Sequence, residues 1–277
     1  MRNRLLLPLV LLSLAANRPG ASTGKDTVTD ADGNQLTLAQ VAAASTQKAG
    51  KEIHTLHVDG ALTLKDPRNA KDPCVVAVYS ILELDKAEDA AGQSLLAPAA
   101  KAPPKSGRKT WLPRTERPMP LKSSELRLSA SADRIDKWVL VARGVRAVKE
   151  ETLEVPASAA AGWTKAGEGL SVRVKEAKVD KRNKGTLKVE YKRDGEGVAG
   201  GAFIHRVDWL NANGIAIGGN TWTGGEGPLS REGVFQSDAP ISVKPGEGAD
   251  VGKLRLTVVT KAEEVDMKFE VEGGVGK

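Results

Sequence analysis

The amino-acid sequence predicts an all-β protein made of two tandem antiparallel β-sandwich modules. Many short segments alternate apolar and polar residues, which is the pattern of a strand with one face on a core. Turns rich in Gly, Asp and Asn separate these segments, and no long amphipathic helical pattern occurs. The ordered segments 251–271 and 126–155 both contain a Leu-Arg-Leu strand and a later strand. This echo predicts that one kind of module occurs twice.

The first 21 residues, 1–21, predict a secretory signal peptide. Arg2 and Arg4 form a basic start, residues 5–14 are mostly apolar, and small residues follow as far as Ala21. The apolar run is too short to span a bilayer, and no cysteine that could carry a lipid anchor follows it. We expect cleavage, with an uncleaved N-terminal anchor as the alternative. The protein is therefore expected to be exported, to the periplasm or the extracellular space.

Composition and charge argue against a nucleic-acid partner, a later membrane-spanning helix and a disulfide. The chain of 277 residues carries a formal charge of +6, with Lys and Glu interspersed along the strands as on solvated faces. This balance argues against nucleic acid as a partner. No later segment reaches the roughly 18 apolar residues of a membrane-spanning helix. A single cysteine, Cys74, rules out an intramolecular disulfide, and its place in the apolar run 74–78 predicts a buried, inert thiol.

The first module is expected at 51–157. Residues 22–50 contain few large apolar side chains and predict a flexible leader, with at most a short helix at 36–44. Residues 97–121 are rich in Pro, Lys and Arg. Because proline lacks the ladder donor of a central strand, this segment predicts a long basic loop.

The second module is expected at 163–273, after the Ala- and Gly-rich boundary 156–169. It contains a hairpin signal at Asn213-Gly214 and a long Gly-rich loop, 218–233. Two strands are expected to close it. Their alternation assigns one set of apolar residues to the core of this module: Leu254, Leu256, Val258, Val265, Met267, Phe269 and Val271.

A D-x-x-G or N-x-N-G turn precedes L-R-L and a final F-E-V strand, with the turns at Asp89–Gly92 and Asn211–Gly214. Over 53–271 this arrangement resembles tandem immunoglobulin-like modules in exported bacterial proteins of uncharacterised function. The resemblance implies an Ig-like sandwich fold and supplies no functional residues. The cysteine–tryptophan–cysteine spacing of true immunoglobulin domains is absent, so the likeness is to the wider sandwich class.

Three motifs invite a chemical reading. Residues 195–200 match G-x-G-x-x-G, but a strand pattern follows where a dinucleotide site needs a helix, which predicts a glycine hairpin loop. Residues 30–34 resemble the start of a calcium loop, but position 12 is Val41, which predicts an Asp-Gly turn. His54 and His57 are three apart and so face opposite sides of a strand. No metal site, cofactor or catalytic motif is therefore expected.

Trp222 is the first candidate contact residue, with its neighbours Asn220 and Thr221 in the Gly-rich loop. An exposed indole on such a loop would stack on a sugar ring or anchor a protein interface. The alternative is that Trp222 folds back over the edge of the sandwich.

Trp111 is the second candidate, between Lys109 and Arg114 in the basic proline-rich segment. An indole beside two cations would hold an acidic polymer or peptide by charge and stacking. The alternative is a solvated linker. Trp138 and Trp209 lie in apolar strand patterns and are expected in cores.

Together these features predict an exported protein without catalytic activity, acting in binding or in envelope or extracellular assembly. Its expected partner is a protein or polysaccharide of the cell envelope. One alternative is a secreted hydrolase, or the carbohydrate-binding module accessory to one. Another is a purely structural spacer.

Overall fold

The computed structural model describes residues 27–48, 51–65, 73–96, 110–123, 126–131, 135–158, 162–180, 184–221, 227–240 and 251–272. These residues form β-strands and two short 3-10 helices, with no α-helix among them, so the all-β prediction is confirmed. Within the same ranges, no helix is long and apolar enough to cross a membrane. The predicted signal peptide, 1–21, lies outside the described residues.

The elements follow one another along the chain as β1 (Thr27–Thr29), β2 (Gln35–Lys48), β3 (Lys51–Thr63), β4 (Cys74–Glu88), β5 (Trp111–Pro113), β6 (Met119–Ser123), β7 (Leu126–Leu128), β8 (Lys137–Pro156), β9 (Thr164–Gly167), β10 (Leu170–Val179), β11 (Lys184–Arg193), η3 (Val198–Gly200), β12 (Phe203–Asn211), β13 (Ala216–Thr221), η4 (Gly227–Leu229), β14 (Glu232–Pro240) and β15 (Val251–Glu272).

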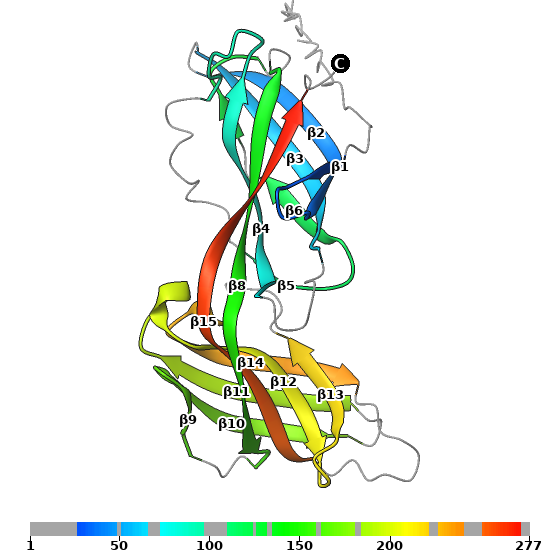
Figure 1. The fold of residues 1–277 in the computed structure, drawn as a ribbon, viewed down its shortest axis with the longest axis vertical. Helices are drawn as coiled ribbons and strands as arrows, with labels where there is room; N and C mark the ends of the chain where they lie inside the picture. The colour runs from blue at the N-terminus through cyan, green and yellow to red at the C-terminus, as the bar shows by residue number, and fades with distance from the viewer. Residues whose placement is uncertain are drawn as a thin grey trace, which may run out of the picture.

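The strands form two sheets. The larger has 11 strands in the order β1-β2-β3-β6-β4-β8-β15-β12-β13, with β5 on β4 and β7 on β3, and the smaller has the order β14-β11-β10-β9. Figure 1 shows an elongated molecule with two lobes end to end. We call β1–β7 with residues 137–147 and 262–272 the upper lobe. Strands β9–β14 with residues 148–156 and 251–261 make the lower lobe.

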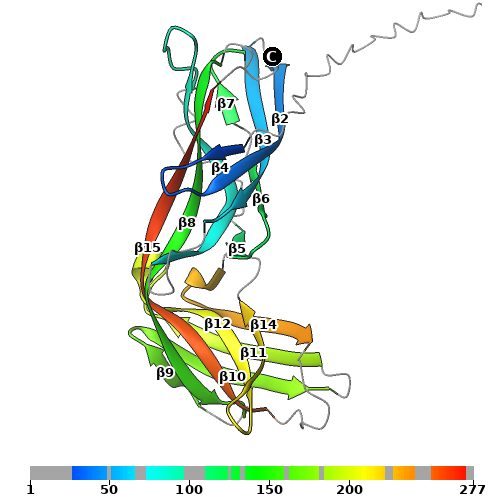
Figure 2. The ribbon, with the colours of Figure 1, turned by 45° about the vertical axis from the view of Figure 1, so that its right-hand side comes forward.

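Strands β8 and β15 run through both lobes (Figures 1 and 2). They pair antiparallel from Lys137 opposite Glu272 to Lys253 opposite Pro156. At about 3.4 Å per residue, each strand extends on the order of 70 Å. The two closing strands expected at 254–271 are therefore one continuous strand. The lobes share their longest elements, so the boundary at 156–169 does not separate two self-contained modules.

The side of β15 that is buried changes along its length. The buried residues are Leu254, Leu256 and Val258 in the lower core, and Met267, Phe269 and Val271 in the upper core. The first three have even numbers and the last three odd, so a strict two-residue alternation cannot bury both sets on one face. Register shifts around Lys261 supply the extra residue. The prediction that all these residues belong to the second module's core is therefore wrong for Met267, Phe269 and Val271.

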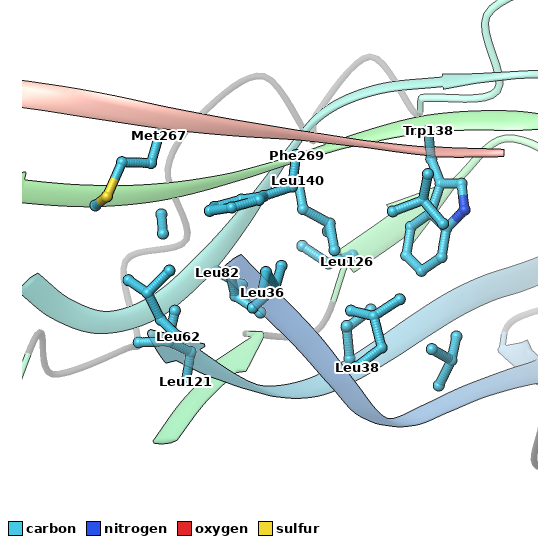
Figure 3. Packing of buried hydrophobic residues seen from close by; sticks show 14 of the residues in the cluster. Leu36, Leu38, Leu62, Leu82, Leu121, Leu126, Trp138, Leu140, Met267 and Phe269 are labelled. Atoms are coloured by element: carbon cyan, nitrogen blue, oxygen red, sulfur yellow. The ribbon is translucent and has the colours of Figure 1, made fainter. Parts of the chain in front are cut away.

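The upper core lies between β2–β3 on one side and β8–β15 on the other, as Figure 3 shows for Leu36 and Leu38 facing Leu140 and Phe269. The prediction of a flexible leader with a short helix is wrong for 35–48. This segment pairs with β3 along its whole length, and its two leucines are buried. The small Ala and Thr side chains of β2 bury little apolar area, but the hydrogen bonds between β2 and β3 satisfy the backbone groups of these residues.

The lower lobe is a two-sheet sandwich. The small sheet packs on the β13-β12-β15-β8 part of the large one. The shared core contains Val172 and Val189 from the small sheet and Val207, Trp209 and Leu256 from the large one. A sandwich is thus observed here, whereas the upper lobe is one curled sheet around its own core.

The same type of turn connects the strands of three hairpins. The side chains of Asp30, Asp89 and Asn211 each accept backbone hydrogen bonds from residues two and four further on, at 2.8–3.0 Å. A glycine with positive φ stands three residues after each. Such Asx turns explain the D-x-x-G pattern, and the predicted Asp-Gly turn at 30–34 is confirmed.

Candidate functional site

Trp111 lies in the joint between the lobes. Strand β5 pairs with β4, with Trp111 opposite Tyr79, and the indole is 1% exposed. Its ring packs edge-to-face with Tyr79 at 6.1 Å and with Phe203 of the lower lobe at 6.0 Å between centroids. The prediction of an exposed indole, whether binding or solvated, is wrong. The proline, lysine and arginine residues near Trp111 in the sequence gave no indication that Phe203 would pack on its ring.

Arg114 is the other member of that predicted site among the described residues. Lys109 lies outside the described residues. Arg114 is half-buried; its backbone N–H donates to the Val76 carbonyl at 2.8 Å, and its Nη2 donates to the Lys65 carbonyl at 3.1 Å. Part of the expected 97–121 loop is strand, since β5 and the first three residues of β6 fall within it. Pro120 is tolerated because β6 pairs there with β3 alone.

The first predicted site is also divided. Trp222 lies outside the described residues. Asn220 and Thr221 are the last residues of β13, opposite Val207 and Arg206 of β12. Val207 is buried in the lower core and Arg206 is exposed on the other side of the sheet. Asn220 and Thr221 therefore face opposite sides, and one flat ligand cannot contact both.

Trp163 is the exposed tryptophan among those that the structure describes. Its exposure is 39%, against 1–2% for Trp111, Trp138 and Trp209. The core positions predicted for Trp138 and Trp209 are confirmed. Sequence reasoning missed Trp163 because it lies in the Ala- and Gly-rich boundary. The available signal was its spacing of two from Lys165, which in extended chain leading into β9 (Thr164–Gly167) places both side chains on one side.

The indole of Trp163 lies against two cations. The Cζ of Arg173 and the Nζ of Lys192 are each 4.8 Å from its ring centroid. Arg173 on β10 points outward because Val172 and Val174 beside it are buried. These distances are within the range of cation–π attraction, which stabilises exposed pairs by about 0.5–1 kcal/mol.

The charges around the indole are only partly balanced. Arg173 donates to Glu190 Oε2 from Nε at 3.0 Å and from Nη2 at 2.6 Å, and these hydrogen bonds lower the pKa of Glu190. Lys175 lies 3.7 Å from the other oxygen of the same carboxylate. In the described part of the chain, neither Lys165 nor Lys192 has a carboxylate within 4 Å. The side nearest the indole, where Glu232 of β14 stands opposite Lys192, thus carries an excess of positive charge.

We define the Trp163 face as the outward side of the small sheet around this indole. Its members come from all four strands or their flanks: Trp163, Lys165, Arg173, Lys188, Glu190, Lys192, Glu232 and Val234. Val234, opposite Glu190, is 46% exposed. Among the described residues, no group of three or more His, Cys, Asp or Glu side chains could hold a metal ion. The face offers an aromatic ring and cations, which suit binding.

Comparisons with known proteins add no functional assignment. Neither protein-family models nor curated proteins give a match. Among solved structures, a chain from "Structure of infectious bursal disease virus Gx strain" is 7% identical and covers 92% of this chain and 70% of its own, with a TM-score of 0.20. A TM-score this low carries no argument about fold or function.

Proposed function

We propose that this chain is an exported, non-catalytic binding protein and that the Trp163 face contacts its partner. The observation that carries the proposal is the exposed indole of Trp163 beside Arg173 and Lys192. Indole and guanidinium groups are enriched where binding energy concentrates, because they combine apolar area with polar contacts. The proposal of a partner from the cell envelope extends the sequence-based expectation of export.

The scaffold behind the face favours recognition. The core side of β10 and β11 is packed into the sandwich, and β8 and β15 continue from this lobe into the next. A binding face on paired strands keeps its side chains in place and loses little conformational entropy when a partner arrives.

The proposal is tested by binding of the purified chain to isolated cell-envelope fractions. Trp163→Ala should reduce sedimentation with the fractions while the Tm stays within about 2 °C, since the indole lies outside the cores. Ile215→Ala is the matched control, because Ile215 is 55% exposed on the β12–β13 hairpin and away from the face. Equal binding by the wild type and Trp163→Ala would refute the proposal.

Export has its own test. A fusion of residues 1–30 to a reporter enzyme that is active only outside the cytoplasm should give activity. Replacement of the apolar residues 5–14 by polar ones should abolish that activity. An active reporter with the polar version would contradict the proposed export.

A structural spacer is the second candidate, and a specific observation favours it. The lobes share two unbroken strands and an aromatic joint made by Trp111, Tyr79 and Phe203. Such a rod would hold its two ends at a fixed distance. A spacer needs no ligand, so it predicts that changes on the Trp163 face leave every binding measurement unaltered.

A further inference from the structure

We infer that the ligand of the Trp163 face is an acidic polysaccharide, with carboxylates on its sugar rings, lying across the small sheet. This inference rests on the proposed binding function and names its ligand class. An indole packs against the apolar C–H side of a sugar ring. Cations on the same face would meet carboxylates of that sugar and of its neighbours.

Charge points to an anionic ligand. Around the indole, Arg173 shares its carboxylate partner Glu190 with Lys175, and Glu176 is shared by Lys178 and Lys188 at 3.3 Å each. These two carboxylates serve four cations, and the exposed Glu232, opposite Lys192 across β11 and β14, is a third carboxylate on this face. Lys192 and Lys165 add two further cations without a carboxylate within 4 Å in the described ranges. A repeating anion would neutralise this excess, whereas a cationic ligand would be repelled.

Shape and apolar content point to a polymer of sugars and away from a protein. Four strands about 4.8 Å apart give an open face roughly 15 Å wide. Its large exposed apolar side chains are Trp163 and Val234, separated by Arg173 and Glu190. A stable protein interface buries about 800 Å² per partner around a desolvated apolar centre. Charged side chains occupy that centre here, so a hydrated, charged chain fits better.

Affinity electrophoresis of the full chain tests the inference, with alginate and polygalacturonate as acidic polysaccharides. Dextran is the neutral control. Poly-L-glutamate is a polymer with carboxylates and no sugar ring. We expect retardation by both acidic polysaccharides and little by dextran or poly-L-glutamate. The affinity for alginate should fall with added NaCl, because exposed charge pairs are screened.

Variants locate the site. Trp163→Ala should weaken alginate binding about tenfold, and Trp163→Phe should restore most of it, since stacking needs an aromatic ring. Lys192→Ala should weaken binding several-fold and flatten its salt dependence. Lys149→Ala is the matched control, because Lys149 is exposed on β8 and away from the face, and it should bind like the wild type. The Tm of each variant is measured in parallel.

The outcomes separate the inference from the proposed function. Binding of dextran or poly-L-glutamate as tightly as alginate, through Trp163, would overturn the ligand class and leave a binding face. Self-association of the chain that Trp163→Ala abolishes would replace the polysaccharide by a second copy. If Trp163→Ala changes neither polysaccharide nor envelope binding, the inference and the proposed function both fail.

Discussion

Arg193 offers the sharpest test of how the lobes are held together. It ends β11 and is 5% exposed. Its guanidinium donates to four backbone carbonyls: Ala202 at 2.8 Å, Leu229 at 2.6 Å, Gly197 at 2.9 Å and Gly201 at 2.7 Å. These carbonyls belong to the segment 197–202 and to η4. Gly227 at the start of η4 lies against the indole of Trp111. Arg193 therefore organises the loops that meet the upper lobe.

Replacing Arg193 by Met keeps most of the side-chain length and removes all the donors. Each buried carbonyl left without a partner costs about 1 kcal/mol, which gives roughly 4 kcal/mol in total. Burial lowers the pKa of Arg193, so removing the charge recovers part of this loss. We expect the free energy of unfolding to fall by about 3 kcal/mol.

The assay is equilibrium unfolding in guanidinium chloride, followed by tryptophan fluorescence and by circular dichroism. Arg231→Met is the matched control: its side chain is 70% exposed and lies 3.9 Å from Glu196. An exposed pair contributes little, so this variant should lose less than about 0.5 kcal/mol. A loss below about 1 kcal/mol for Arg193→Met, or equal losses for both variants, would refute the anchoring role.

Three further predictions concern the joint and β12. Gly227→Ala should lower the free energy of unfolding by about 1 kcal/mol more than Gly214→Ala in the same denaturant assay. Both glycines have positive φ, but only at Gly227 would an added Cβ meet the Trp111 ring, at 2.6 Å. Equal costs would contradict the packing at the joint. Burial, and secondarily Glu264, raises the pKa of Tyr79 to about 12, so its contribution to stability is complete below pH 10 and is lost as the pH rises through 12. Absorbance of the phenolate should show this late step, and Tyr79→Phe should remove it; a step near pH 10 would contradict it. Burial lowers the pKa of His205 to about 4, so the folded state resists its protonation and stability falls as the pH drops from about 6.5 to 4; ring-proton NMR should show a neutral imidazole at pH 5, and a midpoint near 6.5 would refute this.

Local patterns predicted the strands well where one face of the strand is buried and the other is exposed to solvent. The segments around Val172 and Val189 alternate, and both lie in the lower core. The turn residues Asp89 and Asn211 were recognised because an Asx turn is a contact between near neighbours in the chain. Such features depend on a few adjacent residues, so the sequence contains all the information that they require.

The candidate site could not be predicted in the same way. Trp111 is buried because Phe203 and Gly227, both distant in sequence, pack on its ring. Trp163 is exposed because β10 and β11 present Arg173 and Lys192 outside the sandwich. Whether an indole is covered depends on which surfaces come together, and composition around the residue does not decide that. Proline and lysine near Trp111 therefore predicted exposure wrongly.

The C-terminal segment separates the two kinds of information. The sequence by itself determined that Leu254, Leu256 and Val258 face one way, and that Val265, Met267, Phe269 and Val271 form a second alternation. Only the tertiary structure decided that both stretches are one strand, β15, entering two different cores. The physical reason is that alternation assigns side chains to faces, whereas the partner strand β8, paired along the whole length, sets what each face meets.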